Sequence, residues 1–181
     1  MDNNTVEENI VNENIVELNK KIDSTIVIQN IYSNNEKMMN ELRFCKTPDE
    51  LRLYNLMLVK NYVYNNKIFG LLHVQVKYFK KSSNYDNYIK IIQDKLNEAM
   101  EISKTNTNIG GIFVLLDLSN ITQKNFSRKF MKIISKILNE KYDKTLLLCY
   151  VMGNIRIMKV FWPIIKLVME KETKEKLVLL N

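Results

Sequence analysis

Hydrophobic residues in the second half of the chain recur with two different spacings. The continuous apolar run at residues 112–116 is too short for a helix and predicts a fully buried strand, and TLLLCYVM at residues 145–152 predicts another. Apolar positions at helical spacing in residues 85–99 and 126–138 predict two amphipathic helices. Two further strands are expected at residues 72–78 and 176–180. This order predicts an α/β fold, with a mixed, mostly parallel sheet, helices packed on it and right-handed crossovers.

The N-terminal third differs in character and is expected to form a small helical cap beside the sheet. Residues 47–50, Thr-Pro-Asp-Glu, supply an N-cap hydroxyl, a proline at the first helical position and a glutamate at the third. The apolar residues Leu51, Tyr54, Leu58 and Tyr62 follow on one helical face, which predicts a helix ending near residue 65. We therefore divide the chain into an acidic tail and helical cap, residues 1–66, and an α/β lobe, residues 67–181.

The last predicted helix, at about residues 156–170, is unusually apolar. Eleven of the fifteen residues from 155 to 169 are apolar, whereas a surface helix normally has one apolar stripe. Pro163 also interrupts its backbone hydrogen bonding. Such a helix needs apolar contacts on more than one side. Burial between sheet and cap, a bound lipid and a membrane surface all satisfy that need.

Composition excludes several chemistries. The chain has one histidine, and its two cysteines lie about a hundred residues apart, so no metal site is expected. Neither phosphate-binding glycine motif occurs, so no cofactor is expected either. Asp117 ends a predicted strand and more often caps the following turn than performs chemistry, while His73 is expected to face solvent. No catalytic triad can be assembled, and we expect a binding protein rather than an enzyme.

Charge is unevenly distributed along the 181 residues, whose net charge is +7. Residues 1–50 carry 5 Lys and Arg against 10 Asp and Glu, whereas residues 121–181 carry 13 against 5. The basic half could meet anionic lipid or nucleic acid, although a solvated lysine surface is the preferred explanation of the charge alone. No helix-turn-helix, RNA-binding or zinc pattern accompanies the lysines, which disfavours nucleic acid. Without a signal peptide or an 18-residue apolar run, we expect a cytoplasmic protein, peripheral at membranes.

Three segments stand in a distinctive order and spacing: GIFVLLDLSNIT at residues 111–122, YDKT at residues 142–145 and FWPIIKLVMEKETKEKLVLL at residues 161–180. Together they resemble the CRAL-TRIO lipid-binding domain of phosphatidylinositol and retinaldehyde transfer proteins. GIFVLLDLSNIT at residues 111–122 is similar to the family's strand ending in Asp-Leu-x-Gly, with Asn120 in place of glycine. Residues 142–145 occupy the place of the family's Tyr-Pro-Glu-Arg element. FWPIIKLVMEKETKEKLVLL at residues 161–180 resembles the family's gating helix and following strand. Upstream, LRFCK at residues 42–46 is similar to part of the family's N-terminal helices.

The resemblance implies a non-catalytic protein that holds the acyl chain of a phospholipid or another hydrophobic ligand under the gating helix. It implies a pocket lined by Phe113, Leu115, Leu147, Cys149, Val151, Met158, Phe161, Trp162, Ile165 and Met169. Lys144, Lys166 and Lys176 are expected at the headgroup or at a transiently contacted membrane.

Two departures leave an alternative open. Lys144 stands where family members that bind phosphatidylinositol have a glutamate, and the sequence stops at Asn181, before the family's final segment. Both departures favour a protein-interaction scaffold without bound lipid, binding a protein partner. The strand–DLS–helix pattern is also similar to STAS partner-binding domains, which rank third because they lack the tryptophan-containing helix.

Overall fold

The computed structural model describes residues 47–82, 84–142, 144–153, 156, 159, 163 and 171–180. The tail and most of the predicted cap, including residues 42–46, lie outside the described residues. So does most of the predicted gating helix.

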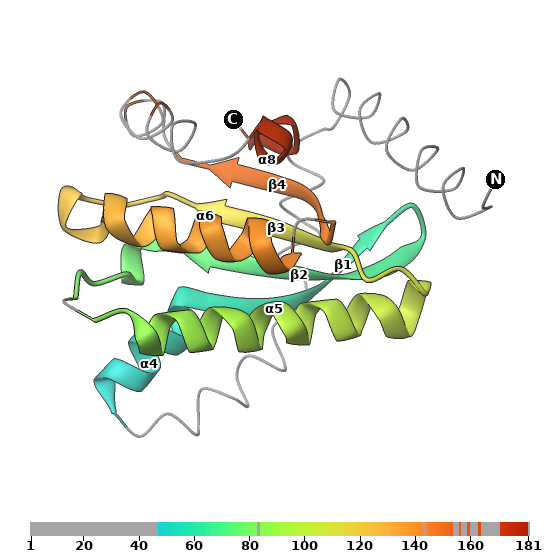
Figure 1. Ribbon diagram of the computed structural model, residues 1–181, viewed down its shortest axis with the longest axis horizontal. Coiled ribbons are helices and arrows are strands. Elements are labelled where there is room, and N and C mark those ends of the chain that lie inside the picture. The colour runs from blue at the N-terminus through green and yellow to red at the C-terminus, as the bar shows by residue number, and fades with distance from the viewer. Residues whose placement is uncertain are drawn as a thin grey trace.

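The described chain folds into one five-stranded sheet with helices between its strands (Figure 1). The strand order is β1-β2-β3-β4-β5; β1 is antiparallel to β2, and every other neighbouring pair is parallel. The predicted α/β class, with its mostly parallel sheet, is therefore confirmed. In chain order the elements are α4 (Pro48–Leu56), β1 (Met57–Tyr64), β2 (Lys67–Gln75), η1 (Val76–Tyr78), α5 (Asp86–Thr107), β3 (Ile112–Asp117), η2 (Gln123–Asn125), α6 (Arg128–Tyr142), β4 (Leu146–Met152), α8 (Lys171–Glu175) and β5 (Leu177–Leu180).

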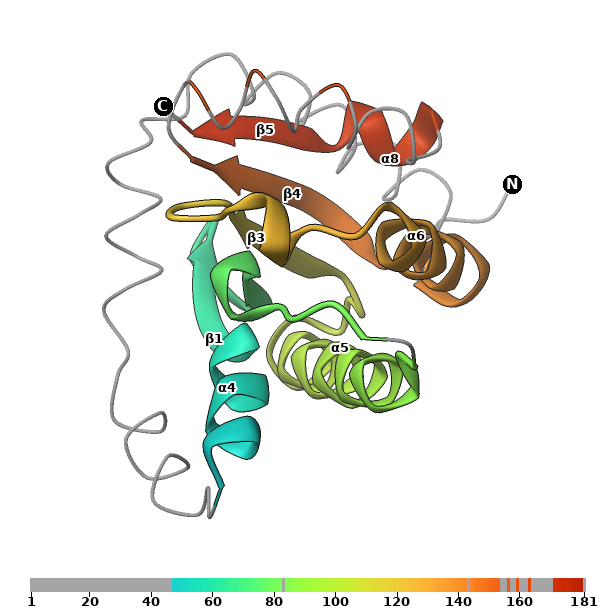
Figure 2. The same cartoon turned by 90° about the vertical axis from the view of Figure 1, so that its left-hand side faces the viewer.

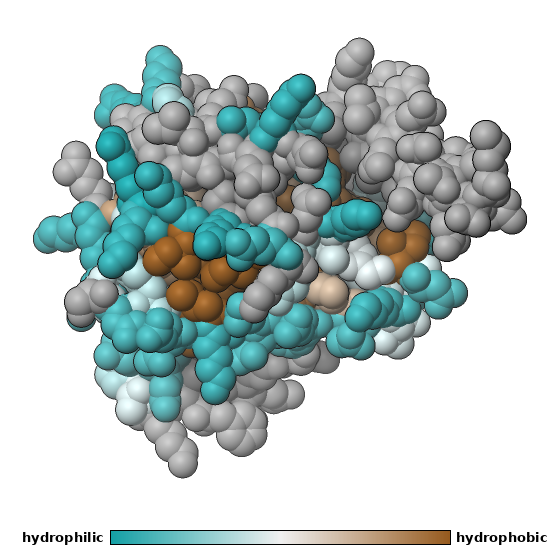
Figure 3. Space-filling model, viewed as in Figure 1, coloured by the Kyte–Doolittle hydropathy of each residue, from teal (hydrophilic) through white to brown (hydrophobic). Residues whose placement is uncertain are grey.

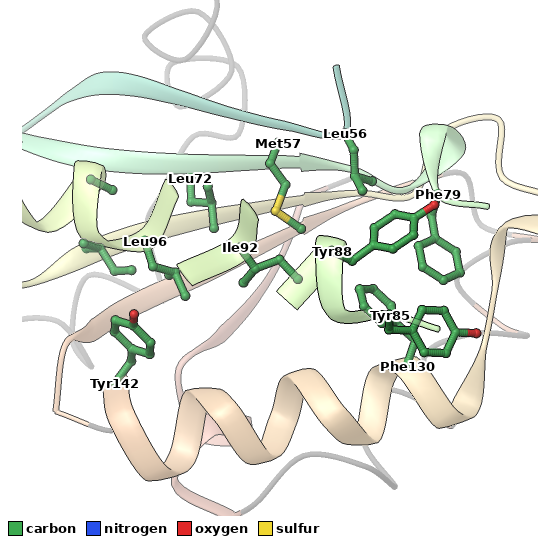
Figure 4. Packing of buried hydrophobic residues seen from close by; sticks show 12 residues of the cluster. Leu56, Met57, Leu72, Phe79, Tyr85, Tyr88, Ile92, Leu96, Phe130 and Tyr142 are labelled. Atoms are coloured by element: carbon green, nitrogen blue, oxygen red, sulfur yellow. The ribbon is translucent and has the colours of Figure 1, made fainter. Parts of the chain in front are cut away.

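Helices α5 and α6 lie side by side on one face of the sheet (Figure 2). Between them and the strands is an apolar core in which α5 buries one side, including Ile92, Leu96 and Ala99 (Figure 4). Phe79, Tyr85, Tyr88 and Phe130 form an aromatic group at one end of this core. On the outer surface, hydrophobic atoms remain visible between the two helices, with hydrophilic side chains around them (Figure 3).

Helix α5 approaches strand β2 closely at Gly70. A β-carbon built on Gly70 would lie 2.6 Å from the Cα of Ala99 and closer still to its carbonyl group. The backbone N–H of Gly70 also donates a hydrogen bond to the hydroxyl of Ser103, 2.8 Å away and fully buried. Only glycine lets helix and strand come this close.

The predicted helix over residues 48–65 is correct for its first half and wrong for its second. Helix α4 begins as expected, with the Thr47 and Glu50 side chains each accepting the other's backbone N–H. Helix α4 ends at Leu56, and the chain continues as β1. Asn65 and Asn66 adopt positive φ values of 49° and 60°, and the turn that they form leads β1 into its antiparallel partner β2. The predicted division at residue 66 falls in this turn, so the sheet begins upstream of it.

Candidate functional site

The sheet face opposite α5 and α6 carries the candidate site, which we call the strand face. Its described cluster members all come from strands, whereas the other face is covered by helices. They are Tyr62, Tyr64, Phe69, Leu71, Phe113, Leu115, Leu147, Leu148, Tyr150, Met152, Val178 and Leu180. This is a broad, largely buried apolar cluster with side chains from all five strands.

Aromatic rings fill the half of the strand face near the β1–β2 turn. The ring of Phe113 lies at the centre, 4.7 Å from that of Tyr62, 5.1 Å from Tyr64 and 5.4 Å from Phe69. The hydroxyls of Tyr62 and Tyr150 are 3.1 Å apart and hydrogen-bonded. Burial raises the pKa of both tyrosines, so both remain neutral phenols at physiological pH.

Three ionisable residues stand on the same face near the carboxyl ends of β2 and β3. Lys60, His73 and Asp117 are 7%, 2% and 5% exposed, and we call them the polar row. Nε2 of His73 lies 3.7 Å from Oδ2 of Asp117, and the other carboxylate oxygen accepts the backbone N–H of Ser119 at 2.8 Å. The polar row therefore contains a buried imidazole close to a buried carboxylate.

The pKa values in the polar row follow from burial and from neighbouring charges. Burial lowers the pKa of His73, and the positive charges of Lys60 and Lys77 lower it further. The neighbouring Asp117 acts to raise this pKa but is outweighed. Burial alone would raise the pKa of Asp117, but the nearby His73 ring and the hydrogen bond from Ser119 outweigh it and hold that pKa below its ordinary value. The folded state thus favours a neutral imidazole beside a carboxylate.

The expectation that His73 faces solvent is wrong, because both faces of β2 are buried at this position. The expectation for Asp117 is confirmed, since its carboxylate caps the turn through Ser119. In the same turn Asn120 has a φ of 58°, which is a left-handed conformation. Asparagine tolerates this conformation, so it can stand where the similar CRAL-TRIO segment has glycine.

Acidification should destabilise the protein through this single histidine. The folded pKa of His73 lies below its ordinary 6.5, so the unfolded state binds the proton more tightly and the free energy of unfolding falls as pH drops below that value. Urea denaturation at pH 7, 6 and 5 should show this fall, up to about 1.4 kcal/mol per pH unit. His73→Gln should flatten it over the same range. Equal unfolding free energies for the wild type at the three pH values would contradict the burial described here.

The five described pocket candidates do not share one surface. Phe113, Leu115 and Leu147 lie on the strand face. Cys149 and Val151 point to the opposite face, where they belong to an apolar cluster that includes Met131 of α6. Burial raises the pKa of the Cys149 thiol to about 12, which leaves it unreactive. Met158, Phe161, Trp162, Ile165 and Met169 lie outside the described residues.

The candidate headgroup lysines are separated along the chain and differ in exposure. Lys144 is exposed between α6 and β4, and Lys176 is half-buried just before β5, where its carbonyl accepts the N–H of Cys149. Lys166 lies outside the described residues. The prediction of one helix over residues 48–65 missed the contribution of β1, although the alternation of Lys60, Tyr62 and Tyr64 with residues of the other face was a usable signal.

Two further searches give negative results within the described part of the chain. No described helix is both long and apolar enough to cross a membrane. Nor do the described residues bring together three or more His, Cys, Asp or Glu side chains that could hold a metal ion.

Comparison with known families identifies the family to which this chain belongs. The sequence model of the CRAL/TRIO domain matches residues 69–181, more than half of the chain. The chain belongs to the CRAL/TRIO domain family. The CRAL/TRIO match includes β3, β4, β5 and most of β2, and therefore most of the strand face. The family comprises lipid-binding and lipid-transfer proteins that bind hydrophobic ligands, generally not enzymes.

A solved structure supports the same fold. The crystal structure of Sfh5 superposes with a TM-score of 0.60 over 92% of this chain and 67% of that one, at 15% sequence identity. Among curated proteins, no sequence matches this chain. At this identity the likeness shows that the CRAL/TRIO fold is shared.

Proposed function

We propose that this CRAL/TRIO protein is a lipid-binding and transfer protein that holds an acyl chain against the strand face without catalysing a reaction. The observation that carries the proposal is a continuous apolar cluster on one face of the sheet of a CRAL/TRIO domain, with side chains from all five strands. Phe113, Leu115 and Leu147 from the expected pocket belong to it. We retain the expected gating helix at residues 156–170 as the element that closes the site.

The energetics of this proposal need only the hydrophobic effect. Each methylene moved from water to an apolar surface contributes about 0.8 kcal/mol, so one acyl chain supplies ample affinity. Release of the ligand would follow when the gating helix contacts a membrane, with Lys144, Lys166 and Lys176 near anionic headgroups. The chain's net charge of +7 favours such a transient contact.

The first test asks whether the protein carries lipid. Native mass spectrometry of the purified chain should detect a bound lipid, and a fluorescent phospholipid should move between vesicles faster in its presence. Protein that is folded but lipid-free, and that neither binds nor moves the fluorescent lipid, would contradict the proposal and favour the scaffold alternative.

A matched pair of variants on β5 localises the binding. Val178 packs on the strand face, whereas its neighbour Leu179 is 42% exposed on the other side of the strand. Val178→Trp should place a large ring against the acyl chain and weaken lipid binding about tenfold, which corresponds to about 1.4 kcal/mol. Leu179→Trp should leave binding unchanged. Equal lipid affinities for the two variants would exclude the strand face as the binding site.

A further inference from the structure

Helix α6 presents a row of cations on its outer side. Arg128, Lys129, Lys132 and Lys136 are all exposed, and their spacing places them on one face of the helix. Lys124 is also exposed and lies in η2, just before the helix. We call these five residues the basic stripe. The apolar residues of α6 belong to the core between the helix and the sheet, so the stripe is the side turned outward (Figure 2).

The positive charge of the stripe is not balanced by the described part of the chain. Residues 124–139 contain no aspartate or glutamate. Within the stripe, only Lys136 forms an ion pair among the described residues, 3.6 Å from the carboxylate of Glu140. Helix α5 differs, because its Lys95 and Lys104 each pair with a glutamate of the same helix. The other four cations of the stripe are therefore available to an external anion.

This arrangement works against the stability of the helix itself. Arg128, Lys132 and Lys136 follow one another at intervals of four residues, and like charges at that spacing destabilise a helix. The first turn of α6 has no acidic residue, although a negative charge there would be favourable. An anionic surface beside the stripe would relieve the repulsion among its cations. The stripe thus fits an anionic partner better than it fits solvent alone.

The chemistry around the stripe favours an anionic bilayer over a single anionic group. Four of its five cations are lysines, which are flexible point charges and suit an array of headgroups rather than one site of fixed geometry. Ile133 and Ile137 of α6 are only partly buried, and hydrophobic atoms are visible between α6 and α5 (Figure 3). Cations beside an apolar strip are typical of helices that lie on a membrane surface.

We propose that the basic stripe binds an anionic lipid bilayer and holds the protein at its surface. The stripe lies on the side of α6 away from the sheet, whereas the ligand of the proposed function lies on the strand face, across the sheet. Contact through the stripe therefore does not involve the strand face and does not depend on a bound ligand. This inference rests on the proposed function only for its choice of a lipid surface.

Sedimentation with vesicles tests the charge preference. Full-length protein, lipid-loaded or delipidated, is mixed with vesicles of phosphatidylcholine alone or of phosphatidylcholine with phosphatidylserine. Both forms of the protein should bind the vesicles that contain phosphatidylserine at least about tenfold more tightly, because several cations act together at an anionic surface. This binding should weaken as the salt concentration rises, because salt screens exposed charges.

A charge-reversal variant assigns the binding to the stripe. Lys129→Glu combined with Lys132→Glu should lower the affinity for the anionic vesicles at least about tenfold. Lys67→Glu combined with Lys104→Glu, at exposed lysines of β2 and α5, makes the same change in net charge and is the matched control. The control should lower the affinity by less than about threefold, because it loses only long-range attraction to the bilayer.

The outcomes separate this inference from the proposed function. A wild type that binds neutral and anionic vesicles equally, or binds neither, overturns the inference, and so does a stripe variant that binds as tightly as its control. Binding to transfer RNA or polyglutamate without binding to vesicles also overturns it. Each of these results leaves the proposed function standing, because native mass spectrometry of bound lipid decides that function separately.

Folding of the variants is checked by circular dichroism. Glutamate at position 132 lies four residues from both Arg128 and Lys136, so the reversal replaces repulsion by attraction and the helix should form. If the double variant nevertheless fails to fold, Lys132→Gln alone should lower the affinity for anionic vesicles about fivefold. An unchanged affinity of that variant would then overturn the inference.

Discussion

Gly70→Ala should destabilise the protein by about 3 kcal/mol or more. The added methyl would meet the backbone of Ala99 rather than a flexible side chain, so α5 must move away from β2. That movement would stretch the hydrogen bond from the N–H of Gly70 to Ser103 and loosen the packing of Leu96. Urea denaturation followed by far-ultraviolet circular dichroism measures the loss.

Gly110→Ala is the matched control. A β-carbon there lies 3.4 Å from the Cε of Lys104, the end of a flexible side chain that can swing aside. We expect the control to unfold within about 0.5 kcal/mol of the wild type, as surface substitutions usually do. A Gly70→Ala protein with the same urea midpoint as Gly110→Ala would show that helix and strand are not in the contact described.

Phe113→Ala should cost about 3–5 kcal/mol of unfolding free energy. The ring is fully buried at the centre of the aromatic half of the strand face, and three neighbouring rings would lose their common partner. Phe113→Leu keeps most of the volume and should cost about 1.5 kcal/mol or less. Guanidinium denaturation of delipidated protein measures both without a contribution from bound lipid.

Val63→Ala on the same sheet provides the comparison. Val63 is 52% exposed near the β1–β2 turn, so its truncation removes little buried surface and should change stability by about 0.5 kcal/mol or less. If Phe113→Ala were as mild as Val63→Ala, the aromatic half would have to be loosely packed. Its rings would then be part of an open cavity rather than a rigid floor.

The sequence predicted the fold well where the apolar residues of a segment fitted only one periodicity, that of a helix or that of a strand. The apolar runs became β3 and β4, and the helical spacing after Tyr85 and Phe126 became α5 and α6. These segments are bounded by polar or glycine-containing loops, so neither their type nor their order was ambiguous. The resemblance to the CRAL-TRIO family came from the same region and was confirmed by the match to residues 69–181.

The sequence failed where two periodicities fitted the same residues. Leu58 and Tyr62 are four residues apart, which places them on one face of a helix and equally on one face of a strand. The Asn65–Asn66 turn decides in favour of the strand. This turn depends on left-handed backbone conformations at both residues, which many residue pairs do not adopt. Missing β1 also hid the contribution of Tyr62 and Tyr64 to the strand face.

The burial of His73 could not be read from local alternation either. His73, Gln75 and Lys77 alternate with apolar residues and so predict a solvent-facing side, yet that side of β2 is the strand face. Whether a strand has one covered side or two depends on parts of the chain distant in sequence. Tertiary packing therefore overrode the local pattern.

The hydrogen bond between the Gly70 amide and Ser103 gives the fold a built-in reporter. Because its acceptor belongs to α5, exchange of this amide with deuterated solvent requires the helix to separate from the sheet. Amides in the middle of β2 that bond to neighbouring strands exchange when the strands separate. Comparing the two exchange rates therefore distinguishes undocking of one helix from global opening of the domain.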